Sequence, residues 1–86
     1  MTDNDINCYI KAECELCESL LKLLQFHWPK IFEVIKWIDI DTNLVAFRKH
    51  GKFIPVIEIN GQVVLHGEID PKKVQKYFGP PSNPLY

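Results

Sequence analysis

Two cysteines near the start of the chain, Cys14 and Cys17, are separated by two residues. This spacing allows the two sulfurs to close a small disulfide loop, which also lets them exchange disulfides with another molecule. In such a reaction one sulfur attacks a substrate disulfide and the second sulfur displaces the product. The pair therefore predicts thiol–disulfide exchange, with Cys14 as the attacking sulfur and Cys17 as the resolving sulfur.

The elements on either side of the pair favour this interpretation. Residues 6–10 carry apolar side chains at every second position, which predicts a strand. Apolar residues then recur at helical spacing from residue 17 to residue 24, which predicts a helix that begins near Cys14 and ends before Pro29. A helix N-terminus offers free backbone N–H groups and a partial positive charge, and both favour a thiolate at Cys14.

Charged neighbours act on this thiolate in both directions. Lys11 lies three residues before Cys14 and could pair with its thiolate. Glu13, Glu15 and Glu18 crowd the same region and should oppose the negative charge. Each effect is about 1 kcal/mol or less at an exposed site. We therefore expect a thiolate at Cys14 that is stabilised, but not to an extreme degree.

Other uses of the cysteines remain open at this point. The pair could be two ordinary cysteines, or it could supply two ligands of a zinc site, for which Cys8 and the three histidines are the available partners. Cys8 lies on the apolar face of its strand, where we expect a small buried core residue. We expect His27, His50 and His66 at the surface, with His50 at a helix C-terminus and His66 near the active site.

Length, composition and charge exclude several classes of protein. The 86 residues suffice for one domain, and their net charge of -1 does not favour a nucleic-acid partner. No apolar run approaches the ~20 residues of a membrane span. The acidic start of the chain argues against an export signal, and three cysteines do not suit a disulfide framework. We expect a monomer in a reducing cytoplasm, with a domain over residues 1–78 and a flexible tail over residues 79–86.

The remaining pattern predicts a small mixed sheet. Further strands are expected at residues 34–40, 55–59 and 62–65, the last two joined by an Asn60-Gly61 hairpin turn. A short helix that Asp41 or Thr42 would cap precedes the third strand, and Asp70-Pro71 should start a final helix. The order β-α-β-α-β-β-α predicts an α/β fold in which three helices flank a four-stranded mixed sheet.

A proline opens the predicted third strand. The Ile54-Pro55 bond could be trans, as in most such bonds, or cis. In the cis form the backbone of Ile54 would turn outward. Its N–H and C=O groups could then pair with an extended thiol substrate, as an added strand does.

Taken together, these residues resemble the glutaredoxin branch of the thioredoxin fold over about residues 6–78. The motifs that carry the resemblance are Lys11-x-x-Cys14-x-x-Cys17, Ile54-Pro55-Val56, Asn60-Gly61 and Gly67. Glu15 and Leu16 stand where glutaredoxins usually carry Pro and Tyr. The chain is similar in this respect to short bacterial glutaredoxin-like proteins.

The resemblance implies a thioredoxin fold with a cis proline that faces the cysteines. It implies catalysis by Cys14 and Cys17, with substrate contacts from Lys11, Glu15, Leu16, Ile54, Pro55 and Gly67. The expected substrate is a disulfide-containing protein or a glutathione mixed disulfide, with glutathione or a thioredoxin reductase as the reductant and no bound cofactor or metal. The alternatives are a non-catalytic thioredoxin-like binding module, or zinc or iron–sulfur binding through the same cysteines.

Overall fold

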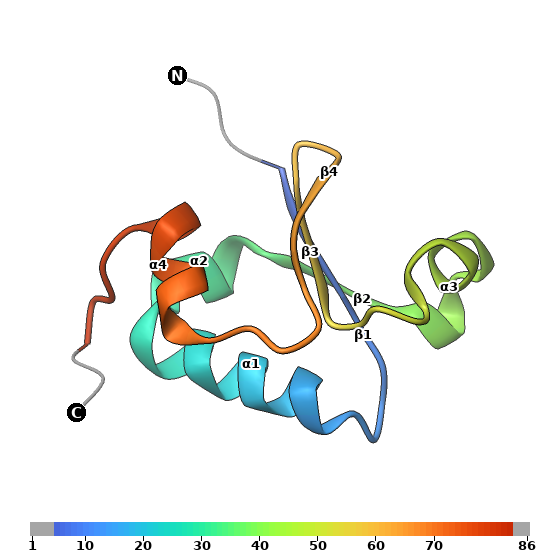
Figure 1. The fold of residues 1–86 in the computed structure, drawn as a ribbon, viewed down its shortest axis with the longest axis horizontal. Coiled ribbons are helices and arrows are strands. Elements are labelled where there is room, and N and C mark those ends of the chain that lie inside the picture. The colour runs from blue at the N-terminus through green and yellow to red at the C-terminus, as the bar shows by residue number, and fades with distance from the viewer. Residues whose placement is uncertain (1–4, 84–86) are drawn as a thin grey trace.

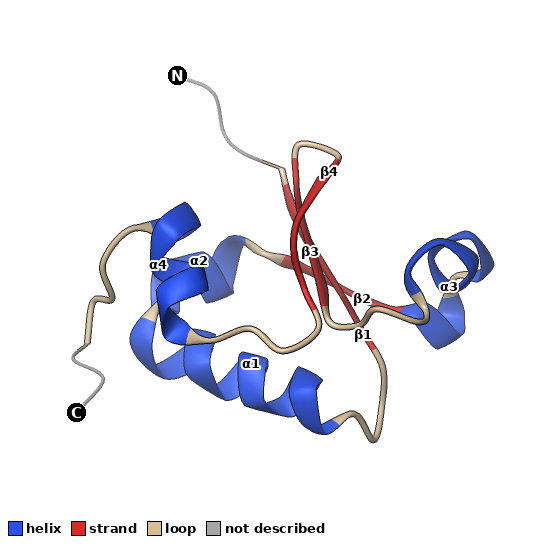
Figure 2. Ribbon diagram, viewed as in Figure 1, coloured by secondary structure: helices blue, strands red, loops and turns tan. Residues whose placement is uncertain are grey.

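The computed structural model describes residues 5–83, which form one four-stranded sheet with helices on both sides (Figures 1 and 2). The strands are β1 (Ile6–Ile10), β2 (Lys36–Asp39), β3 (Val56–Ile59) and β4 (Gln62–His66). The helices are α1 (Glu15–His27), α2 (Pro29–Val34), the 3-10 helix η1 (Ile40–Thr42), α3 (Leu44–His50) and α4 (Pro71–Phe78). Figure 2 shows α1, α2 and α4 gathered together, while α3 stands apart from them beyond the end of β2.

The sheet is mixed, as the sequence predicts, with the strand order β2-β1-β3-β4. β1 pairs with β2 in parallel and with β3 in antiparallel orientation, and β4 runs antiparallel to β3. The β3–β4 hairpin turns at Asn60 and Gly61, whose φ angles are 52° and 83°. Asn and Gly adopt such positive angles more readily than other residues, which explains why this dipeptide occupies the turn.

One face of the sheet packs against α1 and α4 to form the hydrophobic core. Cys8 and Ile57 point from adjacent strands into this core, where they meet Leu24 of α1 and Val74 of α4, and all four side chains are fully buried. The expectation that Cys8 is a small core residue is thereby confirmed. The alternation of apolar residues along β1 exists because one face of that strand is covered by α1.

The sequence predicted three helices, whereas the described residues form four α-helices. Pro29 does end α1, but it also occupies the first position of α2, where its missing N–H costs no hydrogen bond. Because α2 extends to Val34, the second strand is shorter than the predicted 34–40 and Ile40 falls in η1. Asp41 and Thr42 also lie in η1, so the cap of α3 is Asn43, whose side chain accepts the N–H of Ala46 at 3.0 Å.

The segment that follows α4 returns to the end of α1. The indole N–H of Trp28 donates to the carbonyl of Gly79 at 2.9 Å, and the N–H of Ser82 donates to the carbonyl of His27 at 2.8 Å. Gly79 and Ser82 of the predicted flexible tail therefore carry hydrogen bonds to Trp28 and His27 at the end of α1. The rest of that tail, residues 84–86, lies outside the described residues.

The second face of the sheet carries a buried carboxylate, that of Glu58, which is 4% exposed. The Tyr9 hydroxyl donates to Glu58 Oε1 at 2.9 Å, while His50 Nε2 lies 3.1 Å and Lys49 Nζ 3.7 Å from Oε2. The rings of Tyr9 and His50 also stack, with centroids 4.3 Å apart. This network joins the end of α3 to β1 and β3, and each carboxylate oxygen has a partner, as a buried charge requires.

His50 is therefore not at the surface, where we expected it. Its ring is buried between Tyr9 and Glu58, and the attraction of the Glu58 carboxylate explains why a polar ring lies there. The sequence places His50 correctly in the last turn of a helix, but the partner that buries it is eight residues further along the chain.

Replacing Tyr9 with Phe should lower the free energy of unfolding at pH 7 by about 1–3 kcal/mol, because a buried oxygen of Glu58 loses its donor. Burial, together with the hydrogen bond to Glu58, raises the pKa of Tyr9 to about 12. The stability that the protonated hydroxyl confers is present below the unfolded pKa of about 10 and is lost as the pH rises through 12.

Urea unfolding near pH 7 and near pH 11 checks this expectation. The difference between wild type and Tyr9→Phe should be smaller at the higher pH. Tyr77→Phe serves as the control, because Tyr77 is exposed and its replacement should change stability little at either pH. An equal difference for Tyr9→Phe at both pH values would contradict the raised pKa.

Candidate active site

Cys14 occupies the N-cap position of α1, as the sequence predicts. Its backbone is extended, and its Sγ accepts a hydrogen bond from the N–H of Cys17 at 3.2 Å. Its carbonyl accepts the N–H of Glu18 at 3.0 Å, the first hydrogen bond of the helix. Sulfur thus takes the place of the side-chain oxygen that commonly caps a helix. A partial negative charge on this sulfur lies at the positive end of the helix dipole.

The two sulfurs of the pair have different environments. Cys14 is partly exposed, whereas Cys17 is 1% exposed, and the structure holds both as free thiols. Burial raises the pKa of Cys17 to about 12, and its hydrogen bond with Cys14 contributes, although a backbone hydrogen bond with Lys11 opposes the shift. Cys17 is therefore protonated at neutral pH, and Cys14 is the sulfur that a disulfide in solution can reach.

Cys8 is a third sulfur on the inner side of the same region. Burial raises the pKa of the Cys8 thiol, and the proximity of Cys17 adds to the shift. Its side chain is fully buried. Because a protonated, inaccessible thiol does not act as a nucleophile, Cys8 is inert in the folded protein.

The strand register brings the predicted substrate-binding segments to one end of the sheet. Tyr9 pairs with Val56, and Val56 pairs with His66, so these three residues form a row across β1, β3 and β4. The chain that leaves β1 after this row leads to Lys11 and Cys14, and the chain that enters β3 before it contains Ile54 and Pro55.

A glycine closes the corner between these segments. The N–H of Gly67 lies 2.9 Å from the carbonyl oxygen of Pro55 and 3.0 Å from that of Phe53. Gly67 has a φ of 70°, a conformation in which a residue with a Cβ is strained. The Ile54-Pro55 peptide bond is cis, as the resemblance implies.

The predicted substrate-binding residues differ in their exposure. Lys11, Glu15 and Leu16 are exposed around Cys14, Ile54 is half-buried, and Pro55 is buried. Exposed carboxylates of Glu13 and Glu18 lie close along the chain to the same cysteine. The side chains that could contact a substrate are thus distributed over the α1 N-terminus and the entrance to β3.

Sequence reasoning placed His66 near the active site but missed its ring partner Phe53 and the buried Glu58 network. Phe53 and His66 form an edge-to-face ring pair, with centroids 5.8 Å apart, beside the predicted substrate segment. Glu58 lies in an otherwise apolar strand, and a carboxylate in such a strand is a signal of a buried partner. The partners themselves, Tyr9 and His50, come from distant parts of the chain.

Residues 5–83 contain neither a cluster of metal ligands nor a membrane-spanning helix. No group of three or more His, Cys, Asp or Glu side chains there is arranged to hold a metal ion. None of the helices in that range has the length and apolar character needed to cross a bilayer, and the longest, α1, has 13 residues.

Glu13 adopts a conformation that side chains rarely take. Its φ is 58°, in the left-handed region, immediately before the Cys14 cap. A residue with a Cβ in this region costs roughly 1–2 kcal/mol relative to its ordinary conformations. The sharp turn that delivers Cys14 to the helix is thus held in place by the elements on either side of it.

We expect alkylation by iodoacetamide at neutral pH to modify Cys14 first. Cys17 and Cys8 should react at least about tenfold more slowly, because both are buried and both have raised pKa values. Mass spectrometry of peptides after brief exposure measures the order of modification. In denaturant the three rates should converge, and faster modification of Cys17 in the folded protein would contradict the assignment.

Replacing Glu13 with Gly should leave the free energy of unfolding unchanged or raise it by up to about 1 kcal/mol, since glycine adopts a positive φ without strain. Glu15→Gly is the matched control, because it makes the same Glu-to-Gly change inside the first turn of α1. At that position glycine disfavours the helix by up to about 1 kcal/mol. Chemical unfolding should therefore show Glu13→Gly to be at least as stable as the wild type and Glu15→Gly to be less stable. Equal destabilisation by both would show that the turn is not strained.

Comparisons with known proteins agree with the fold described above. The model of the Glutaredoxin-like domain (DUF836) family matches residues 5–79. Among solved structures, the chain is similar to the solution NMR structure of protein Ne2328 from Nitrosomonas europaea, with a TM-score of 0.69 and 22% sequence identity over 90% of this chain and 93% of that one. A search of curated proteins found no match. Because the family model covers nearly the whole described chain, the protein belongs to the Glutaredoxin-like domain family.

Proposed function

We propose that the protein is a thiol–disulfide oxidoreductase that uses Cys14 and Cys17 as a dithiol. The observation that carries the proposal is the difference between the two sulfurs. Cys14 is accessible at the positive end of α1 with its Sγ accepting a hydrogen bond, whereas Cys17 is buried and protonated one turn further on. Membership of a glutaredoxin-like family supports the same reaction class.

The proposed reaction transfers two electrons to the substrate. The Cys14 thiolate attacks one sulfur of a substrate disulfide, the substrate S–S bond breaks, and the leaving thiolate takes a proton from solvent. Cys17 then loses its proton and attacks Cys14 Sγ, which releases the second substrate thiol and leaves a Cys14–Cys17 disulfide. Two molecules of glutathione, or a dithiol reductase, restore the reduced pair in the cytoplasm.

The residues around the pair would position the substrate. Lys11 is exposed three residues before Cys14, and we assign to its ammonium the pairing with the Cys14 thiolate or with a substrate carboxylate. Glu15 and Leu16 are exposed between the two cysteines, and Leu16 offers an apolar contact. The backbone of Ile54 and Pro55, with the Gly67 corner behind it, is the surface to which we assign the extended chain next to the substrate sulfur.

We expect Cys14→Ser to abolish reduction of glutathione disulfide, because no other accessible thiol among residues 5–83 can attack it. Cys17→Ser should still react once and then accumulate a glutathione mixed disulfide at Cys14, because the resolving thiol is missing. Mass spectrometry of each variant after exposure to glutathione disulfide detects the adduct and its position.

Cys8→Ser is the control for these variants. It removes the one thiol that takes no part in the proposed reaction and should retain turnover in the fraction that folds. Wild type that neither forms an adduct nor becomes oxidised would contradict the proposal and favour a binding module. Zinc or an iron–sulfur cluster in anaerobically purified protein, lost on Cys14→Ser, would favour metal binding instead.

A further inference from the structure

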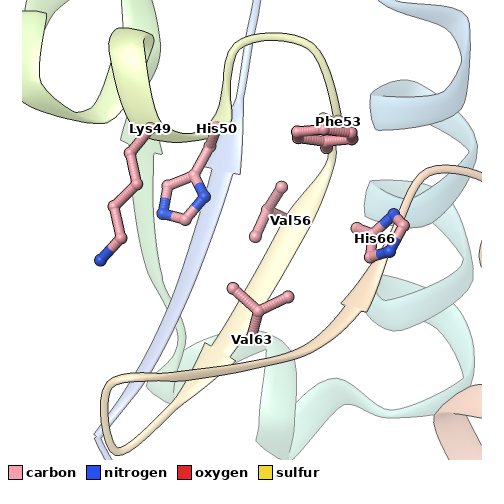
Figure 3. Close-up of a pocket in the computed structure, with 6 residues that line it drawn as sticks. All are labelled: Lys49, His50, Phe53, Val56, Val63 and His66. Atoms are coloured by element: carbon pink, nitrogen blue, oxygen red, sulfur yellow. The ribbon is translucent and has the colours of Figure 1, made fainter.

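A cavity of about 300 Å³ lies on the second face of the sheet, outside the cysteine pair. Figure 3 shows Val56 and Val63 in its centre, with His50 on one side, His66 on the other and Phe53 at one end. Lys49 projects beside His50 at the border of this cavity. The lining is mostly apolar, and the side chains of Phe53 and Val63 remain about half exposed.

The cavity is continuous with the segment to which we assign the substrate backbone. Val56 directly follows Pro55, and the carbonyls of Pro55 and Phe53 both accept the N–H of Gly67. His66, the residue before Gly67, pairs with Val56 and packs against the Phe53 ring. A molecule whose chain lies along Ile54 and Pro55 therefore passes the mouth of this cavity.

The border of the cavity is positively charged. Lys49 lines the cavity, and Arg48 and Lys52 are its close neighbours in the chain; all three are exposed, and residues 48–53 contain no acidic side chain. The carboxylate of Glu58 lies 3.7 Å from Lys49 Nζ and offsets part of its charge, whereas Arg48 and Lys52 form no ion pair with a described residue. This combination of an apolar cavity and a cationic border is complementary to an apolar side chain next to a carboxylate.

We propose that this cavity is a substrate subsite, and that the substrate is a protein with an aromatic or large aliphatic residue, flanked by an acidic residue, near its reactive cysteine. The inference rests on the proposed redox function and names the substrate class for it. The cavity lining begins at Val56, directly after Pro55, and reaches Val63, which pairs with Glu58. Because Val56 and Glu58 are two residues apart on β3, the cavity extends about 7 Å along that strand. An extended chain bound at Pro55 would thus place a side chain there about two residues from its cysteine.

Single-turnover oxidation of the reduced protein by disulfide-linked peptide dimers tests this inference. The first peptide has the symmetrical sequence Glu-Phe-Ser-Cys-Ser-Phe-Glu, so that the direction of binding does not matter. The second has Ala for Phe, the third has Lys for Glu, and glutathione disulfide is the small reference. We expect the first peptide to react about tenfold faster than the second and about threefold faster than the third, because it alone fills the cavity and pairs with its border.

Val63→Glu places a carboxylate at the mouth of the cavity, where the native side chain is 46% exposed. We expect it to reduce the rate with the first peptide about tenfold, to that of the Ala peptide, while the rate with glutathione disulfide stays within about twofold of wild type. Val34→Glu is the matched control, because Val34 is 61% exposed on α2, away from the cavity, and this variant should keep the wild-type preference.

The possible failures are distinguishable. If neither glutathione disulfide nor any peptide oxidises the wild type, the proposed redox function is wrong. The subsite proposal is then wrong as well, because it rests on that function. If glutathione disulfide reacts but the three peptides react at one rate, the redox function stands and the subsite is wrong. The subsite is also wrong if glutathione disulfide reacts faster than the first peptide, or if Val63→Glu slows every disulfide equally.

Discussion

The antiparallel register between β1 and β3 is the constraint on which the rest of the molecule depends. Cys8 pairs with Ile57 and Tyr9 pairs with Val56, and successive side chains along each strand face opposite sides of the sheet. A one-residue shift of β1 would turn Cys8 out of the core, and a one-residue shift of β3 would carry the Glu58 carboxylate into it. Since an unpaired buried charge costs several kcal/mol, the Glu58 network makes that alternative register unfavourable.

The same register gives the two faces of the sheet different side chains and different contacts. The face that meets α1 and α4 is apolar and closely packed, and it fixes the helix whose N-terminus presents Cys14. The other face is held by polar contacts to the end of α3, and it keeps open space beside β4. The packed face therefore supports the helix that carries Cys14, and the open space lies on the opposite face of the sheet.

Much of this arrangement could be predicted from the sequence where the signals are local. The Cys14 cap depends on its immediate neighbours, the Asn60-Gly61 turn on two residues, and the start of α4 on Asp70 and Pro71. The second helix does not follow from the sequence, because Pro29 both ends a helix and suits the first position of another.

The burial of His50 and the cavity beside it could not be predicted from local patterns. Both depend on contacts between residues far apart in the sequence, such as Tyr9 with Glu58 and Phe53 with His66. A histidine at a helix C-terminus is equally compatible with solvent and with a buried partner, and only the folded chain brings the carboxylate to it. Local propensity fixes the elements, whereas tertiary pairing decides which of their polar groups are covered.

In the proposed dithiol reaction, the hydrogen bond from the Cys17 N–H to Cys14 Sγ would couple the start of α1 to oxidation of the pair. A sulfur in a disulfide is neutral and accepts hydrogen bonds weakly, so oxidation weakens the cap that begins α1. A thermodynamic cycle then requires that whatever free energy this cap contributes to the reduced fold also opposes its oxidation. The redox potential of the pair and the stability of the first turn of α1 are therefore two measures of a single interaction.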